Sequence, residues 1–176
     1  MKRFLWAILF SVGLVVSCAP FSKEMMRQVD ESLTFREVQK DPQLFSGKTV
    51  LWGGLIVETT NRKNETLIQV MQTELDYEKK PKNLDGSGGR FLVRYDGFLD
   101  PVIYSRGREI TVAGEVVGKE VLPLGEIQYA YPIILAKEIR LWEKRQVVRP
   151  VYPPWYWDPH PFWWYRYPYW WYRPYR

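Results

Sequence analysis

The chain has 176 residues, a formal net charge of +5 and a pI of about 9.2, and it contains one cysteine and one histidine. With a single cysteine, Cys18, the chain has no disulfide framework. Because the histidine is His160, near the C-terminus, the central domain also has no cluster of histidine and cysteine for a metal and no Cys-His or Ser-His catalytic pair. Residues 18–145 are neutral, with 19 Lys or Arg and 19 Asp or Glu, which argues against nucleic acid as a partner.

The first 17 residues have the pattern of a signal peptide that is removed from the mature chain. Lys2 and Arg3 precede an apolar run, Phe4–Val16, of 13 residues. This run is shorter than the roughly 20 residues that a membrane-spanning helix needs. It leads into the sequence VVSC, which ends at Cys18 and is typical of a bacterial lipobox. We therefore predict a lipoprotein signal peptide over residues 1–17 and lipid attachment at Cys18.

Lipid attachment at Cys18 predicts a membrane-anchored protein. The sulfur of a lipobox cysteine forms a thioether with diacylglycerol, and the amine that cleavage exposes takes an N-acyl chain. Two or three acyl chains hold a protein much more firmly than one myristoyl chain, which binds reversibly. Ala19 stands where an aspartate would hinder transfer to the outer membrane of diderm bacteria. Outer-membrane lipid is the expected partner, no cofactor is expected, and the alternative is an ordinary secretory signal with an incidental cysteine.

The segment after Cys18 is predicted to be a flexible, lipidated tether over residues 18–33, because it is polar and has little periodicity. Thr34 and Glu37 then have the spacing of a capping box, which predicts one short helix over residues 35–40. Pro42 follows the end of this helix. The folded domain is expected to cover residues 34–145.

Between Gly47 and Trp142 the apolar residues alternate with a period of two, which is the signal of β-strands. The expected strands cover residues 49–58, 65–72, 90–95, 109–116 and 132–142, with a possible hairpin partner for the last strand within residues 117–129. Gly53 and Gly54 are interpreted as a bulge or a sharp bend in the first strand. Five or six short strands, one of them bent, favour a mainly β fold and a small OB-like barrel over a sandwich.

Two carboxylates, Asp96 and Asp100, are the residues of the domain that most suggest catalysis, because paired acids near an aromatic residue occur in glycosidases. In the segment YDGFLDP, however, each of them begins a turn-like pair, Asp-Gly or Asp-Pro. We interpret both as turn residues. The sequence therefore predicts no catalytic residue, no metal site and no enzymatic activity.

Three segments of the domain carry a family resemblance: GKTVLWGGLIVE (47–58), GRFLVRYDGFLDPVIYSRGREITVAGEVVG (89–118) and GEIQYAYPIILAKEIRLW (125–142). Together with the lipobox, they resemble the Slp family of outer-membrane lipoproteins, which is named for a starvation-inducible member. The resemblance implies a small lipid-anchored domain on the outer membrane, with links to stationary phase or stress in some members, and it implies no reaction. The chain after residue 142 is interpreted as a departure from the family.

Residues 146–176 are predicted to be an extended, irregular tail. From Val151 to Arg176, fourteen of 26 residues are Trp, Tyr or Phe and six are Pro, which rules out a regular helix or a central strand. Tryptophan and tyrosine rings suit the headgroup region of a membrane, and arginine can pair with lipid phosphates. The residues expected to contact the membrane or a glycan are Trp155, Trp157, Trp163, Trp164, Arg166, Trp170, Trp171 and Arg173.

Other partners also fit this tail. Aromatic rings stack on sugars, so the alternative function is an envelope binding module that recognises peptidoglycan, lipopolysaccharide or another envelope protein. The tail could instead fold back onto apolar surface of the domain or of a second copy. The favoured interpretation is a non-enzymatic, lipid-anchored outer-membrane protein that faces the periplasm, with a tail that contacts the membrane interface.

Overall fold

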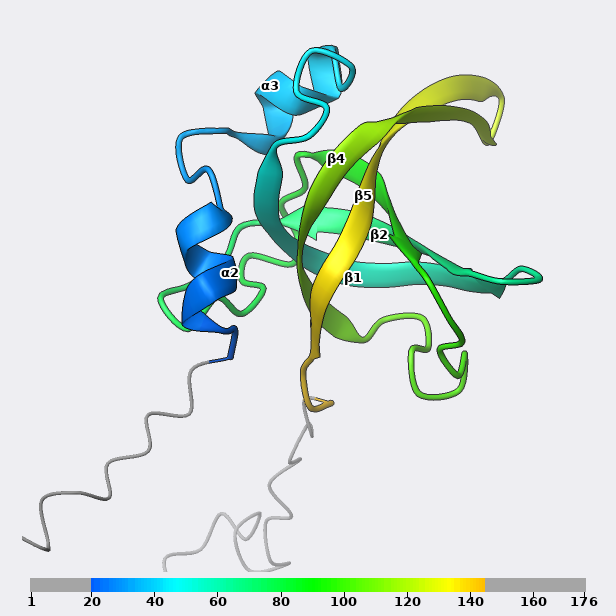
Figure 1. Cartoon of the computed structure of the whole chain (residues 1–176). Helices are drawn as coiled ribbons and strands as arrows, with labels where there is room; N and C mark the ends of the chain where they lie inside the picture. The colour runs from blue at the N-terminus through cyan, green and yellow to red at the C-terminus, as the bar shows by residue number, and fades with distance from the viewer. Residues whose placement is uncertain (1–19, 145–176) are drawn as a thin grey trace, which may run out of the picture. The chain divides into compact units, whose positions relative to one another are not determined.

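The computed structural model describes residues 20–144, and residues 1–19 and 145–176 lie outside the described part of the chain (Figure 1). Within residues 20–144 the elements in chain order are α2 (Lys23–Gln28), α3 (Phe35–Lys40), β1 (Thr49–Asn61), β2 (Thr66–Thr73), β3 (Gly89–Tyr95), β4 (Glu109–Leu124) and β5 (Ile127–Leu141). The strands close into a barrel in the order β1-β2-β3-β5-β4. Adjacent strands are antiparallel except β3 and β5, which are parallel. This arrangement confirms the predicted mainly β, OB-like barrel.

The last two strands are longer than the sequence pattern indicated. We expected strands over residues 109–116 and 132–142, with a separate hairpin partner between them. In the structure β4 and β5 form one continuous ladder, from Ile110 paired with Leu141 to Leu124 paired with Ile127. Gly125 has a φ of +63° in the tight turn between them, a conformation that glycine adopts without strain. The far end of this β4–β5 hairpin curls away from the barrel wall at the top of Figure 1.

β1 bends strongly, so that its first half pairs with β4 and its second half with β2 (Figure 1). Gly53 and Gly54 pair with both neighbours and show no register shift. The register shift in the pairing with β2 lies between Ile56 and Glu58, so of the two predicted alternatives, a bulge or a sharp bend at the two glycines, the bulge is wrong in its position while the strand does bend. The glycines are needed for close packing, because a β-carbon on Gly54 would lie 1.8 Å from the carbonyl oxygen of Met71.

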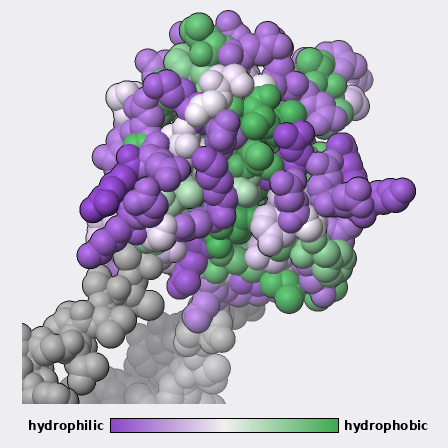
Figure 2. All heavy atoms as spheres, viewed as in Figure 1, coloured by the Kyte–Doolittle hydropathy of each residue, from purple (hydrophilic) through white to green (hydrophobic). Residues whose placement is uncertain are grey.

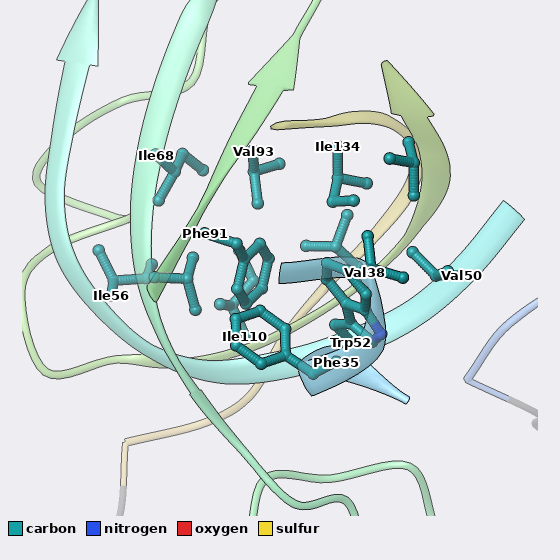
Figure 3. Close-up of a cluster of buried hydrophobic side chains, with 13 residues drawn as sticks. Phe35, Val38, Val50, Trp52, Ile56, Ile68, Phe91, Val93, Ile110 and Ile134 are labelled. Carbon is teal, nitrogen blue, oxygen red and sulfur yellow. The ribbon is translucent and has the colours of Figure 1, made fainter. Parts of the chain in front are cut away.

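The hydrophobic core fills the barrel, and α3 contributes to it from one end (Figure 3). Phe35 of α3 contacts Trp52 of β1 edge to face, with ring centroids 4.9 Å apart, and Trp52 contacts Phe91 of β3 at 5.5 Å. The predicted capping box begins α3: the Thr34 hydroxyl accepts a hydrogen bond from the Glu37 backbone N–H, and the Glu37 carboxylate accepts one from the Thr34 N–H at 2.9 Å. The Thr34 hydroxyl also donates to the Glu37 carboxylate at 2.7 Å, and this hydrogen bond, together with the one from the Thr34 N–H, lowers the pKa of the Glu37 carboxyl.

We predicted a flexible tether over residues 18–33, and the described part of this segment, residues 20–33, is instead partly helical and docked. It contains a second helix, α2, whose N-cap Ser22 accepts a hydrogen bond from the Met25 backbone N–H at 3.1 Å. Phe21 and Met25 are buried against Ala113 of β4 and Leu51 of β1, in a cluster separate from the barrel core. The helix has six residues and buries only Met25, while Phe21 precedes its N-cap, so the sequence offered too few repeats for a periodicity to appear.

Candidate functional site

The residues predicted to act at the membrane all lie outside the described residues. These residues are Cys18 and the tail side chains Trp155, Trp157, Trp163, Trp164, Arg166, Trp170, Trp171 and Arg173. The structure instead describes the two points at which the chain leads to them, at residue 20 and at residue 144. Both points lie on the lower edge of the domain in Figure 1. We treat this edge as the candidate site and call it the anchor end.

At the N-terminal side of the anchor end, the chain docks on the barrel soon after Cys18. Among the described residues Phe21 is the first with a buried side chain, and it follows Cys18 by three residues. Ser22 is held by Glu138 of β5, whose carboxylate accepts a hydrogen bond from the Ser22 backbone N–H at 3.0 Å. Since a residue spans at most about 3.5 Å of extended chain, the backbone of Cys18 lies within about 10 Å of the Phe21 backbone. The barrel is therefore close to whatever holds Cys18.

At the C-terminal side, the chain is fixed up to Trp142, one residue beyond β5. The Trp142 backbone N–H donates to the carbonyl of Glu109 at 2.9 Å, and the Trp142 indole N–H donates to the Thr111 hydroxyl at 3.0 Å. Arg108 donates from Nη2 to the Trp142 carbonyl at 2.6 Å. The chain thus leaves the barrel next to the first residue of β4.

The connection between β3 and β4, residues 96–108, lies at the same end and contains both candidate carboxylates. Asp100 begins a turn, as predicted: its Oδ1 accepts a hydrogen bond from the Val102 backbone N–H at 2.8 Å, and its carbonyl accepts one from Tyr104. Asp96 is exposed and follows the last residue of β3. Nothing in these contacts places the two carboxylates around a shared reaction centre.

A hollow between α3, β2 and the loop before β3 lies away from the anchor end. It has a volume of about 600 Å³ and is lined by side chains of α3, by the end of β2 and by the loop before β3. Phe35 and Gln72 are among the lining residues, and Gln72 accepts a hydrogen bond from the Gly88 backbone N–H at 3.0 Å. The ring of Phe35 is buried in the barrel core, so this hollow offers no exposed aromatic face on which a sugar could stack.

Residues 20–144 show neither a cluster of metal-binding side chains nor a membrane-spanning helix. In this part of the chain no group of three or more His, Cys, Asp or Glu side chains is placed to hold a metal ion. No helix among the same residues has the length and apolar character needed to cross a membrane.

Similar proteins were found both among solved structures and among curated sequences. The structure of a small single-stranded DNA-binding protein from Streptomyces coelicolor matches 54% of this chain and 92% of its own, with 16% identity and a TM-score of 0.34. A likeness of this size carries no argument about a ligand. Outer membrane protein Slp from Escherichia coli is 29% identical over 152 residues, which cover 85% of this chain and 80% of that protein.

Two other curated proteins match a smaller part of the chain. The uncharacterized lipoprotein YeaY of Escherichia coli is 31% identical over 68% of this chain and 63% of its own length. An uncharacterized protein of Haemophilus influenzae is 34% identical over 62% of this chain and 60% of its own length. The chain thus spans somewhat less than two thirds of each of these two relatives.

A family model matches residues 15–176, a range that begins within the lipobox and includes the aromatic tail. This range corrects our interpretation that the chain departs from the family after residue 142. It also agrees with the resemblance carried by the three segments between residues 47 and 142. The chain belongs to the outer membrane lipoprotein Slp family.

Proposed function

We propose that this protein is a non-enzymatic lipoprotein that diacylglycerol and an N-acyl chain on Cys18 hold on the outer membrane, with its barrel on the periplasmic side. The observation that carries the proposal is the docking of the N-terminal segment. Phe21, Ser22 and Met25 fix this segment on the barrel within three to seven residues of Cys18. The family match, which includes residues 15–18, supports the same attachment point.

The acyl chains provide the binding energy and the docked segment provides the orientation. Each buried methylene contributes about 0.8 kcal/mol, so an acyl chain of about 16 carbons contributes on the order of 10 kcal/mol. A long flexible tether would let the barrel turn freely above the bilayer. The short link to Phe21 instead keeps the anchor end of the barrel next to the lipid.

The attachment is tested by comparing the protein, expressed from its own leader, with the Cys18→Ser variant. We expect the unchanged protein in the outer-membrane fraction, with an intact mass equal to residues 18–176 plus diacylglycerol and an N-acyl chain. The variant should lose these lipids, because a hydroxyl does not form the thioether, and should leave the outer-membrane fraction. An unmodified, soluble product from the unchanged leader would contradict the proposal.

We also propose that the tail contacts the membrane interface. The chain leaves the barrel beside two basic side chains, since Arg140 and Lys80 lie 5.5 Å and 5.7 Å from the ring of Trp142. The tail itself adds fourteen aromatic residues after Val151. Because the lipid already holds the chain at the bilayer, the effective concentration is high and a weak affinity of the tail suffices.

Deletion of residues 150–176 tests the contribution of the tail in the unlipidated Cys18→Ala protein. We expect binding to lipid vesicles to weaken by about tenfold or more, because the interfacial Trp, Tyr and Arg side chains are removed. The deletion starts eight residues beyond Trp142, whose backbone N–H donates to Glu109, so it leaves the described contacts of the barrel in place and the thermal unfolding midpoint should not change. Unchanged vesicle binding would contradict the role of the tail.

An envelope binding module remains the alternative function, with glycan or another envelope protein bound by the barrel or the tail. Retention of the soluble protein on isolated cell-wall sacculi, lost on deletion of residues 150–176, would favour it over membrane contact. Cross-linking between the tail and the barrel or a second copy would favour the folded-back tail. A link to stationary phase or stress is tested by following the protein level through growth.

A further inference from the structure

The β3–β4 connection, residues 96–108, exposes large apolar side chains that the fold does not use. Val102 is 82% exposed, Phe98 is 72% exposed and Ile103 is 53% exposed. Within residues 20–144, seven large hydrophobic side chains are exposed to this degree, and three of them belong to this loop of 13 residues. Three such side chains on one loop form a local apolar surface, which on a soluble domain marks a site of interaction.

The loop holds this shape through its own hydrogen bonds to the barrel. The Thr66 hydroxyl donates to the Gly97 carbonyl at 2.8 Å and accepts from the Leu99 backbone N–H at 3.0 Å. The Thr59 hydroxyl donates to the Tyr104 carbonyl at 2.7 Å. Leu99 and Tyr104 pack against the barrel core. The residues between and beside these fixed points are therefore presented to solvent in a preformed arrangement, with little ordering cost on binding.

The loop lies at the anchor end. Its last residue, Arg108, is joined to the C-terminal exit by the hydrogen bond to the Trp142 carbonyl at 2.6 Å. The N-terminal junction contacts the same pair of strands, where Ser22 meets Glu138 and Phe21 meets Ala113. Figure 1 shows the start of α2, the end of β5 and the loop along the lower edge of the domain, opposite the tip of the β4–β5 hairpin. In Figure 2 apolar residues lie at the lower right, where Figure 1 places this loop.

The charges of the loop are balanced. It contains two Asp and two Arg, and the Asp100 carboxylate already accepts a hydrogen bond from Val102. Electrostatic attraction therefore contributes little to binding by this loop. Its apolar side chains provide the attraction, and such binding depends weakly on salt.

We propose that Phe98, Val102 and Ile103 insert into the headgroup region of the bilayer, so that the barrel contacts the membrane through this loop. The inference rests on the proposed lipid anchor at Cys18, whose backbone lies within about 10 Å of the Phe21 backbone. A protein partner is less favoured, because a stable protein interface uses about 20–30 residues on each side, far more than this loop offers. The loop is a third contact, distinct from the lipid and the tail.

The test measures the environment of one labelled residue in the lipidated mature protein on vesicles of phosphatidylethanolamine and phosphatidylglycerol. Cys18 is the only cysteine of the chain, and its sulfur is blocked by the thioether in the lipidated protein. The Val102→Cys variant therefore carries one free thiol for a fluorescent nitrobenzoxadiazole label. The matched control is Val121→Cys, because Val121 is also exposed but lies on the far part of the β4–β5 hairpin.

We expect the label at position 102 to shift to the blue and to brighten by about twofold or more on membrane binding, as for a group at the acyl boundary. Nitroxide-bearing lipids should quench it, and high salt should not reverse the change. The label at position 121 should keep its emission in water. A protein that stays on the vesicles with position 102 in water, or with position 121 in lipid instead, would overturn the loop contact and leave the lipid anchor standing. A protein that does not stay on the vesicles would overturn both.

Discussion

Replacing Gly54 with alanine is expected to unfold the barrel or to destabilise it by about 3 kcal/mol or more. The new β-carbon would lie 1.8 Å from the carbonyl oxygen of Met71 and 2.7 Å from its carbonyl carbon. Both atoms belong to the backbone, so no change of rotamer relieves the contact. Gly54 also pairs with Gln72 of β2 on one side and with Ile110 of β4 on the other. β1 therefore cannot move away from β2 without losing that pairing and crowding β4.

The measurement is urea unfolding of the mature chain, followed by circular dichroism, with Gly86→Ala as the matched control. Gly86 lies in an exposed loop, and a β-carbon there would meet only the Asn83 carbonyl at 3.5 Å. The control should therefore stay within about 0.5 kcal/mol of the unchanged protein. If both variants unfold at the same urea concentration as the unchanged protein, the pairing of β1 with β2 at Gly54 is wrong.

Replacing Phe91 with alanine is expected to cost about 3–5 kcal/mol of stability, because a fully buried ring is lost and a cavity remains. Phe91 lies at the centre of the core, with ring centroids 5.5 Å from Trp52 and 6.1 Å from Phe35 (Figure 3). Since Phe35 belongs to α3, the loss should also loosen this helix from the barrel. Near-ultraviolet circular dichroism of the aromatic residues and the free energy of unfolding both report this change.

The matched control for this variant is Phe98→Ala, which removes the same ring from an exposed position of residues 96–108. We expect the free energy of unfolding to change by no more than about 0.5 kcal/mol. A large loss of stability would mean that Phe98 is part of the fold. It would also weaken the inference that this side chain is free to enter a bilayer.

The strands could be predicted from the sequence because their apolar and polar side chains alternate, but this alternation identifies only the face of each strand that points into the barrel core. In β3, Phe91 and Val93 point into the barrel core as the pattern predicts. Leu92 lies on the opposite face of the strand, yet it is also buried, in a separate cluster with Leu67 and Tyr131. Tyr131 reaches this cluster from β5, far along the chain. Burial of a side chain by a strand that is distant in the sequence does not change the local hydrophobic period.

The candidate site also has one part that could be predicted from the sequence and one part that could not. Cys18 could be proposed from the sequence because a lipobox is a local pattern of neighbouring residues. The apolar side chains of residues 96–108 could not, because Phe98, Val102 and Ile103 are of the same types as the residues of the core. The hydrogen bonds of Thr66 and Thr59, and the packing of two other loop side chains against the core, show which side of this loop faces the barrel. The docking of Phe21 was missed for a related reason, since one buried aromatic residue has no periodicity.

The strand that closes the barrel is also the last strand of the domain. β5 joins β3 to β4, so until Leu141 is available both of these strands have an unpaired edge. A chain that is exported and acylated at Cys18 as we propose, with its N-terminus crossing the inner membrane first, exposes this cysteine long before it delivers β5. Acylation can therefore proceed on a domain that has not yet closed, and the anchored, still open strands need protection from one another during that interval. Completion of translocation, and not lipid attachment, sets the time at which the fold is achieved.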